Sequence, residues 1–324
     1  MLVNDTFLNK FRFSVLHFKI KTLEDLILPE FSGSTLRGAF GNTLKNICCT
    51  QKKHDCHQCL LITSCPFGYI FSTPSAKEST RLRNLQDIPR PYVIRPNDIT
   101  GGKHKEGSIL DFEQVIIGRA IDYLPYFIVA FKEMGEEGIG KEKGRYKLIT
   151  VTAKNPHKSK YETLYNSKKG DIIYNEGIRI RWIDILDYKD EELCRIEINF
   201  ATPLRLETQG LLLEWAPEFE ELIISLSRRI NNLAYFHCSI LEELNFADIK
   251  KRAYGVEIAD AEIKTVNWSR YSEHQNRKIP MKGIVGKVIY EGDLTPFTHL
   301  LRLGEYINLG KNTTMGLGRI SLSI

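Results

Sequence analysis

The fold is decided by a stretch near the C-terminus that has an echo in the first half of the chain. Residues 303–322 read LGEYINLGKNTTMGLGRISL, and residues 134–148 read MGEEGIGKEKGRYKL. In both stretches a helical pattern ends at a glycine, glycines and cations follow, and a Gly-Arg pair enters a strand-like run. We interpret this as two copies of a βαββαβ unit. The predicted fold class is therefore α+β, with two tandem ferredoxin-like (RRM-like) domains.

The chain has 324 residues, enough for two domains of about 150 residues each. We expect an N-terminal domain over residues 1–190 and a C-terminal domain over residues 191–324. The patterns of the first domain predict a strand (11–20), a helix capped by Ser34 and a helix around 120–134 that is kinked or begins at Pro125. Those of the second predict a strand (193–200), a helix (217–236), a strand pair (283–290), a helix (296–305) and a last strand (320–324).

The glycine-rich loop, Gly310 to Arg319, has the composition of a phosphate-binding loop. Its glycines allow successive backbone N–H groups to converge on a phosphate, while Lys311 and Arg319 add positive charge. The spacing differs from that of a P-loop and of a dinucleotide fingerprint. The alternative is a tight turn near the end of the chain. We predict that this loop holds an RNA backbone.

Positive charge is concentrated in two segments of a chain whose formal net charge is only +5. Residues 138–160 carry seven Lys/Arg against one acid, and residues 263–290 carry six against one. The second segment also contains Trp268, Tyr271 and Tyr290. A plain solvated surface is the alternative, but aromatic rings among cations favour unpaired bases and phosphates.

The helix predicted after Ser34 carries an unusual face. Leu36, Phe40, Leu44 and Ile47 form its apolar stripe, and Arg37, Gly41 and Lys45 recur at steps of four on an adjoining face. Gly38 and Gly41 each cost about 1 kcal/mol relative to alanine in a helix. This cost suggests that something approaches the backbone closely; the alternative is packing against another element.

Five of the seven cysteines lie between residues 48 and 65, which predicts a small metal knuckle. Cys49, Cys56, Cys59 and Cys65 are the expected ligands of a structural zinc ion. An iron–sulfur cluster and free thiols are the alternatives, and Cys48, His54 and His57 are possible substitute ligands. Cys194 and Cys238 lie in apolar patterns and are expected in the core.

Several classes of protein are excluded or disfavoured. No run of about 18 apolar residues is present, and the N-terminus lacks the pattern of a secretory signal, so a cytoplasmic location is expected. The motifs HExxH and GxSxG are also absent from the sequence.

Three segments together resemble the CRISPR-associated pre-crRNA-processing endoribonucleases of the RAMP superfamily. The first is Gly33 to Gly41, continuing into Cys56–Cys59 and Cys65–Phe67. The second runs from Leu124 to Tyr146. The third is Trp268 to Arg277, followed by Gly283, Gly286 and Gly292, and ends in the glycine-rich loop. The cysteine-containing half resembles the subgroup often found beside type III systems.

The resemblance implies that the chain binds CRISPR repeat RNA (pre-crRNA) and cuts it without a catalytic metal. The ribose 2′-OH attacks the adjacent phosphate and leaves a cyclic phosphate and a 5′-hydroxyl, which requires a base, an acid and cations. The expected RNA-binding residues are Arg37, Lys45, Arg270, Arg277, Gly310, Lys311, Gly316, Gly318 and Arg319.

The sequence offers two candidates for the catalytic histidine. The family often carries a histidine directly after Gly-Ala-Phe-Gly, where this chain has Asn42, which cannot exchange protons. His274 and His57 are the conceivable replacements. One alternative is a non-catalytic RNA-binding subunit of a CRISPR effector complex, and another is an unrelated zinc-stabilised protein without an RNA partner.

Overall fold

The computed structural model describes residues 2–51, 56–62, 64–74, 88–99, 101–155, 160–173, 178–186, 192–272 and 277–323. By packing, the chain forms two compact units. The N-terminal unit comprises Arg12–Ile180 with Phe236–Ser239, and the C-terminal unit comprises Met1–Phe11, Arg181–Tyr235 and Ile240–Ile324. This division falls between residues 180 and 181, whereas the sequence predicted a domain boundary between 190 and 191.

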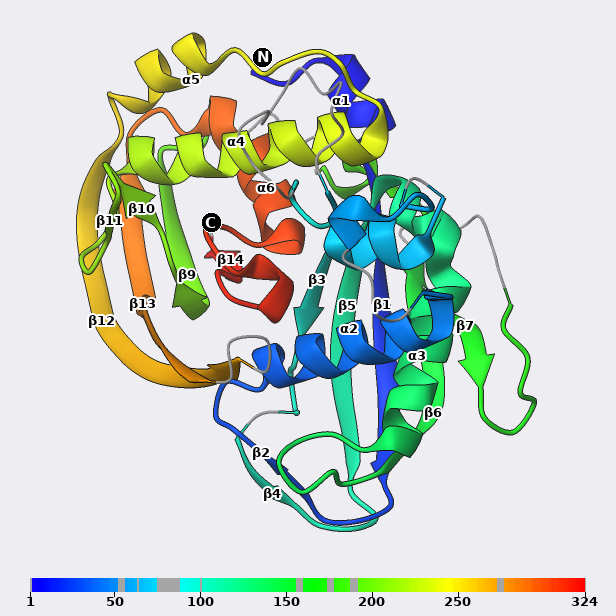
Figure 1. Cartoon of the computed structure of the whole chain (residues 1–324). Helices are drawn as coiled ribbons and strands as arrows, with labels where there is room; N and C mark the ends of the chain where they lie inside the picture. Colours follow the sequence, from blue (N-terminus) through cyan, green and yellow to red (C-terminus); the bar gives the residue numbers. More distant parts are fainter. Residues whose placement is uncertain are drawn as a thin grey trace. The chain divides into compact units, whose positions relative to one another are not determined.

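The N-terminal unit is built on an antiparallel sheet with the strand order β3-β5-β1-β6-β7. Its helices α2 and α3 lie against one face of the sheet (Figure 1). The order β1-α2-β3-β5-α3-β6 along the chain is the predicted βαββαβ succession. The strands are β1 (Arg12–Thr22), β3 (Tyr92–Arg95), β5 (Ile109–Ile117), β6 (Tyr146–Asn155) and β7 (Lys160–Asn166), and the short strands are β2 (Leu26–Leu28), β4 (Gly102–His104) and β8 (Ile180–Arg181).

The core of this unit is aromatic. Phe18 of β1 stacks on Phe112 of β5 at 4.7 Å between ring centroids, and Phe40 of α2 stacks on Phe131 of α3 at 5.0 Å. All four side chains have at most 1% of their surface exposed. Each such ring contributes about 1.5–3 kcal/mol through burial, so these residues fix both helices on the sheet.

The helix ends differ in part from the prediction. Helix α2 (Gly33–Cys48) has Ser32 as its N-cap residue, so the prediction that Ser34 caps the helix was wrong. The Ser32 hydroxyl donates to the carbonyl of Ile99 instead. Helix α3 (Leu124–Glu137) begins with Pro125 in its first turn and follows the 3₁₀ segment η3 (Gly118–Tyr123). Proline is tolerated there because the first N–H groups of a helix have no acceptor within it.

The C-terminal unit repeats the same plan. Its sheet has the order β12-β13-β9-β14, and the chain order is β9-α4-β12-β13-α6-β14. In both units the first strand lies between the third and the fourth, so the predicted tandem ferredoxin-like duplication is confirmed. The elements are β9 (Arg195–Leu204), β10 (Glu207–Thr208), β11 (Leu211–Leu212), α4 (Phe219–Cys238), α5 (Phe246–Ala253), β12 (Glu257–Ser272), β13 (Arg277–Glu291), α6 (Thr298–Ile307) and β14 (Ile320–Ser323).

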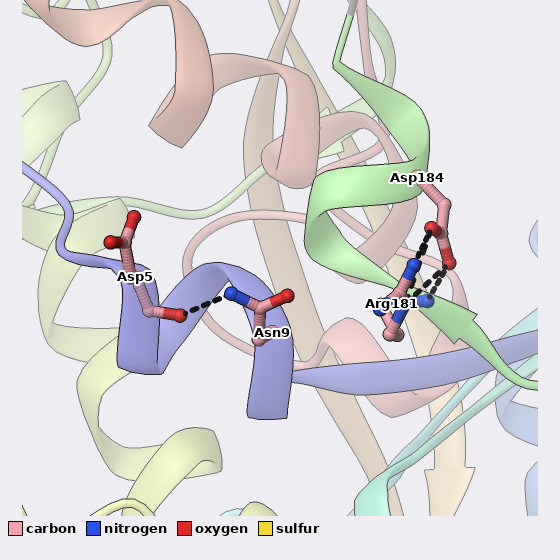
Figure 2. Close-up of polar contacts among 4 residues, drawn as sticks. All are labelled: Asp5, Asn9, Arg181 and Asp184. Atoms are coloured by element: carbon pink, nitrogen blue, oxygen red, sulfur yellow. Dashed lines mark hydrogen bonds and ion pairs between the residues drawn. The ribbon is translucent and has the colours of Figure 1, made fainter.

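The first residues of the chain belong to the C-terminal unit. Helix α1 (Asp5–Lys10) packs on Trp182, whose fully buried ring lies 5.8 Å from that of Phe11. Figure 2 shows polar contacts within two short segments of this region: Asn9 donates to the Asp5 carbonyl in α1, and the Arg181 guanidinium pairs with Asp184 at 2.8 Å. The described part of the chain contains no helix long and apolar enough to cross a membrane.

Candidate nucleic-acid interface

The glycine-rich loop is held on the end of β9 by backbone hydrogen bonds. The Leu309 N–H donates to the Gly318 carbonyl at 2.8 Å and closes the base of the loop. The Gly318 N–H donates to Pro203 at 3.0 Å, and the Lys311 N–H donates to Arg205 at 2.8 Å. Both acceptors lie at or just after the end of β9, so the sheet positions the loop.

The glycines of this loop are required by its path. Gly310, Gly316 and Gly318 all have positive φ angles, of 80°, 81° and 69°. A Cβ atom at Gly310 would lie 2.5 Å from the Arg205 carbonyl oxygen, and one at Gly318 would overlap the Leu309 carbonyl. These glycines therefore serve the conformation and packing of the loop.

The donors that remain available lie at the tip of the loop. Asn312 precedes the 3₁₀ turn η7 (Thr313–Met315) and Thr314 lies within it; both are half-buried, and their N–H groups have no acceptor within the described residues, whereas Thr313 between them is buried. The N–H groups of Lys311, Gly316 and Gly318 already donate to backbone carbonyls. A phosphate would therefore be bound by the tip rather than by the whole length of the loop.

The charged side chains around the loop are partly paired. Lys311 Nζ lies 2.5 Å from Glu207 Oε2, and both side chains keep solvent exposure. Arg319 is half-buried, and its N–H donates to the Thr202 hydroxyl at 2.9 Å. Glu207 therefore competes with any bound anion for the Lys311 ammonium group. The hydrogen bond from the Arg319 N–H to Thr202 fixes the backbone of Arg319.

Arg205 connects the loop to the β12–β13 hairpin. Its carbonyl accepts from Lys311, and its Nη1 donates to the Lys282 carbonyl of β13 at 3.1 Å. Burial lowers the pKa of Arg205 below its ordinary value, with the nearby Glu207 opposing the shift. No pattern in the sequence pointed to this residue.

The far end of the hairpin carries the cationic and aromatic residues singled out in the sequence. Tyr271 of β12 lies opposite Lys278 of β13, and more than half of the tyrosine is exposed. Arg270 lies opposite Ile279 and Arg277 opposite Ser272 on the other face of the ribbon. The proposed catalytic residue His274 lies outside the described residues.

Helix α2 shows why one of its glycines is needed. A Cβ atom at Gly41 would overlap the ring of Phe71, so packing accounts for this glycine. Gly38 has open space around it, with no atom within 4 Å of an added Cβ. The guanidinium of Arg37 lies over the Phe71 ring at 4.5 Å from its centroid, and Arg90 donates to the Phe71 carbonyl at 2.6 Å. Arg37 is therefore held by a cation–π contact.

Asn42 is an exposed residue of α2, one residue after Gly41, and Lys45 lies half-buried in the last turn. The backbone of His57 belongs to the 3₁₀ turn η1 (Cys56–Gln58), while its side chain lies outside the described residues.

The predicted zinc site receives no support. Among the described residues, no group of three or more His, Cys, Asp or Glu side chains could hold a metal ion. Cys49, Cys56, Cys59 and Cys65 are all free thiols and half-buried. Burial raises the pKa of Cys48 to about 11 and also raises that of Cys56.

Arg229 and Asn308, which the sequence-based argument missed, hold the base of the loop. Arg229 donates to the carbonyls of Ile307 and Asn308 at the end of α6. Asn308 is fully buried with a φ of 60°, and its Nδ2 donates to the Leu317 carbonyl at 3.0 Å. The sequence did contain a signal for Arg229. This cation lies between Leu226 and Leu233, two residues of the apolar stripe of helix α4.

Two family models match separate parts of the chain. Residues 198–320 match the model of the CRISPR-associated endoribonuclease Cas6, and this range includes the whole glycine-rich loop. Residues 11–177 match a model described as an N-terminal domain, AF_1859_N. No curated protein matches the sequence.

Several solved structures that share this fold contain Cas6 proteins. A Cas6 product complex matches with a TM-score of 0.57 at 12% identity, over 96% of this chain and all of that one. Thermus thermophilus Cas6 matches with a TM-score of 0.54 at 10% identity, over 97% of this chain and 99% of that one. A partial Cas6-RT-Cas1–Cas2 complex matches with a TM-score of 0.56 at 12% identity, over all of this chain and 47% of that one. At these identities the likeness shows the fold.

Proposed function

Because this chain belongs to the CRISPR-associated endoribonuclease Cas6 family, we propose that it binds CRISPR repeat RNA and cuts pre-crRNA within each repeat. The observation that carries the proposal is the match of residues 198–320 to the Cas6 model, which contains the loop, its supporting residue Arg205 and the cationic hairpin. The free N–H groups of Asn312 and Thr314, two half-buried residues, support phosphate binding at the loop tip.

The chemistry proposed is transesterification within the RNA strand. A base removes the proton of the ribose 2′-OH, the 2′-oxygen bonds to the adjacent phosphorus, and the bond to the 5′-oxygen breaks. The 5′-oxygen takes up a proton, and the products are a 2′,3′-cyclic phosphate and a 5′-hydroxyl. Arg319 and Lys311 would stabilise the charge of the phosphorane because they lie on either side of the loop tip.

The direct experiment incubates the purified protein with its cognate repeat RNA in EDTA. We expect one cut per repeat and a cyclic phosphate on the upstream product. A repeat with a 2′-deoxy sugar at the scissile position should bind with unchanged affinity and stay intact. Loss of cleavage in EDTA would contradict the metal-independent mechanism, and binding without any cut would contradict the nuclease.

A second candidate function is that of a non-catalytic repeat-binding subunit of a CRISPR effector complex. Asn42 favours it, because an exposed amide stands on α2 where the family often has a histidine. This function predicts repeat binding and co-purification with partner proteins, without product. Substitution Asn42→His separates the active nuclease from the non-catalytic subunit. If the wild-type protein does not cut the repeat and Asn42→His does, the chain is a binding subunit that has lost its nuclease function.

No metal is needed for the proposed reaction. A structural zinc ion held by Cys49, Cys56, Cys59 and Cys65 stays a prediction from spacing alone, to which the described residues add no support. Metal analysis of the purified protein tests it directly: one zinc per chain would support the knuckle, and less than 0.2 zinc per chain, on the order expected for free thiols, would refute it.

A further inference from the structure

The N-terminal sheet has a second face whose residues the proposed function does not use. Alternation along β1 places Leu16 and Phe18 in the core with α2 and α3, and therefore places His17 and Lys19 on the opposite face. His17 has 29% of its side chain exposed, and Lys19 is exposed. This opposite face is called the open face below.

A row of polar side chains crosses the open face. Strand pairing aligns Arg95 of β3, Glu113 of β5, His17 of β1, Thr152 of β6 and Thr163 of β7 in one line. Arg95 Nη1 and His17 Nδ1 both lie 3.4 Å from oxygens of the Glu113 carboxylate. The carboxylate is 15% exposed, and the Arg95 guanidinium on one side compensates its charge, while the His17 ring lies on the other side.

The His17 ring is also fixed by an aromatic neighbour. Its centroid lies 4.8 Å from that of Tyr161 on β7, with the two rings perpendicular. Tyr161 has 59% of its surface exposed, although burial of such an aromatic ring is favourable. Tyr161 lies opposite Lys154 of β6, which is exposed. The exposed ring of Tyr161 thus lies next to His17 on β1 and to Lys154 on β6.

Among the described residues, the charges around this pair are matched by opposite charges except at Lys154. Burial lowers the pKa of His17, while Glu113 and Asp111 raise it and Lys154 and Arg95 lower it. The imidazole is therefore neutral at pH 7 and able to form neutral hydrogen bonds to a base edge. Asp111 is balanced by Lys19, which lies directly opposite it on β1. Lys154 faces solvent beside the aromatic pair.

We propose that Tyr161, His17 and Lys154 form a binding subsite for one unpaired nucleotide of the RNA, with the base stacked on Tyr161 and its phosphate near Lys154. Stacking on an exposed aromatic ring of a sheet, with a cation beside it, is how single-stranded RNA is commonly held. The proposal rests on the proposed function, since the nucleotide belongs to the same repeat RNA. The subsite contributes to binding and takes no part in the chemical step.

The test measures the dissociation constant of wild-type protein and variants for repeat RNA by fluorescence anisotropy. Tyr161→Ala should weaken binding roughly tenfold, the loss expected for one stacked base. Tyr161→Phe retains the ring and should stay within about twofold of wild type. The matched control is Tyr254→Ala, since Tyr254 is 85% exposed in the C-terminal unit. The cleavage rate at saturating protein should be equal in all four proteins.

The outcomes separate this proposal from the proposed function. If wild type binds and cuts the repeat while Tyr161→Ala binds within about twofold of it, the subsite does not exist and the endoribonuclease stands. An equal loss in Tyr161→Phe, or an equal loss in Tyr254→Ala, would also overturn stacking on Tyr161. If wild type itself fails to bind the repeat, the proposed function fails and the subsite fails with it.

Discussion

Arg229 donates two hydrogen bonds to the carbonyl of Ile307, from Nε at 3.0 Å and from Nη2 at 2.9 Å. Ile307 is the last residue of α6, so the guanidinium lies at the negative end of the helix dipole. Burial lowers the pKa of Arg229 to about 10, which leaves the side chain charged at neutral pH. Because the next residue, Asn308, spans the base of the glycine-rich loop, Arg229 links the helix end to the loop.

Replacing Arg229 should therefore affect both stability and RNA binding. Arg229→Ala leaves three hydrogen-bond contacts to two carbonyls unmade and should lower the free energy of unfolding by about 3 kcal/mol. Urea unfolding measures this loss. The neighbouring exposed residue supplies the control: Arg228→Ala should change stability by less than about 0.5 kcal/mol. Equal effects in the two variants would contradict the capping role.

The loop glycines can be tested in the same way. Gly318→Ala should destabilise the C-terminal unit by about 2–3 kcal/mol, because the new Cβ meets the Leu309 carbonyl in addition to the strain of a positive φ. Gly210→Ala shares the positive φ, at 81°, but has open space around it, and should cost only about 1 kcal/mol. Thermal unfolding compares the two, and repeat binding should fall only in Gly318→Ala.

The two helical glycines of α2 should respond in opposite directions. Gly41→Ala places a methyl group against the Phe71 ring and should destabilise the protein by about 1–3 kcal/mol. Gly38→Ala has no steric obstacle and should stabilise the helix by up to about 1 kcal/mol. If RNA approaches the helix at Gly38, this stabilised variant will bind the repeat more weakly. Unchanged affinity would show that Gly38 has no part in binding.

The Lys311–Glu207 pair predicts how the affinity depends on salt. Glu207→Gln removes the competing carboxylate and should tighten repeat binding about twofold to threefold at low salt. Lys311→Gln should weaken binding and reduce the slope of log affinity against log salt by about one. Affinities measured between 50 and 200 mM salt, roughly the range in which phosphate contacts show their effect, test both. An unchanged slope in Lys311→Gln would place the lysine outside the interface.

Thiol reactivity should follow burial. Burial raises the pKa values of Cys48 and Cys238 to about 11, so at pH 8 only about one thiol in a thousand is ionised at each position. Cys194, which was predicted to lie in the core, is exposed and should alkylate first in the native protein, with Cys238 modified only as the pH rises toward 11 or after unfolding. Mass spectrometry of peptides after timed iodoacetamide treatment gives the order. Early modification of Cys238 would contradict its burial.

Local sequence was enough to predict the duplicated plan. The period of the apolar residues in β1, α2 and α4, and the Gly-Arg pairs at 144–145 and 318–319, depend on neighbours along the chain and are visible without a structure. The long strand β12 was missed, because its residues 257–272 are mostly exposed and polar, and a hairpin edge has no strong apolar alternation.

The roles of single residues were decided only by tertiary structure. Gly38 and Gly41 look alike in sequence, yet only Gly41 faces a ring, and that ring comes from Phe71, thirty positions further along. Arg229, Asn308 and Arg205 act through carbonyls that lie near them only after folding. His17, Glu113 and Tyr161 meet through strand register, which depends on pairing between distant segments. The sequence by itself therefore determined the repeated plan, most of its elements other than β12, and the loop's composition, while contacts between distant residues determined what each side chain does.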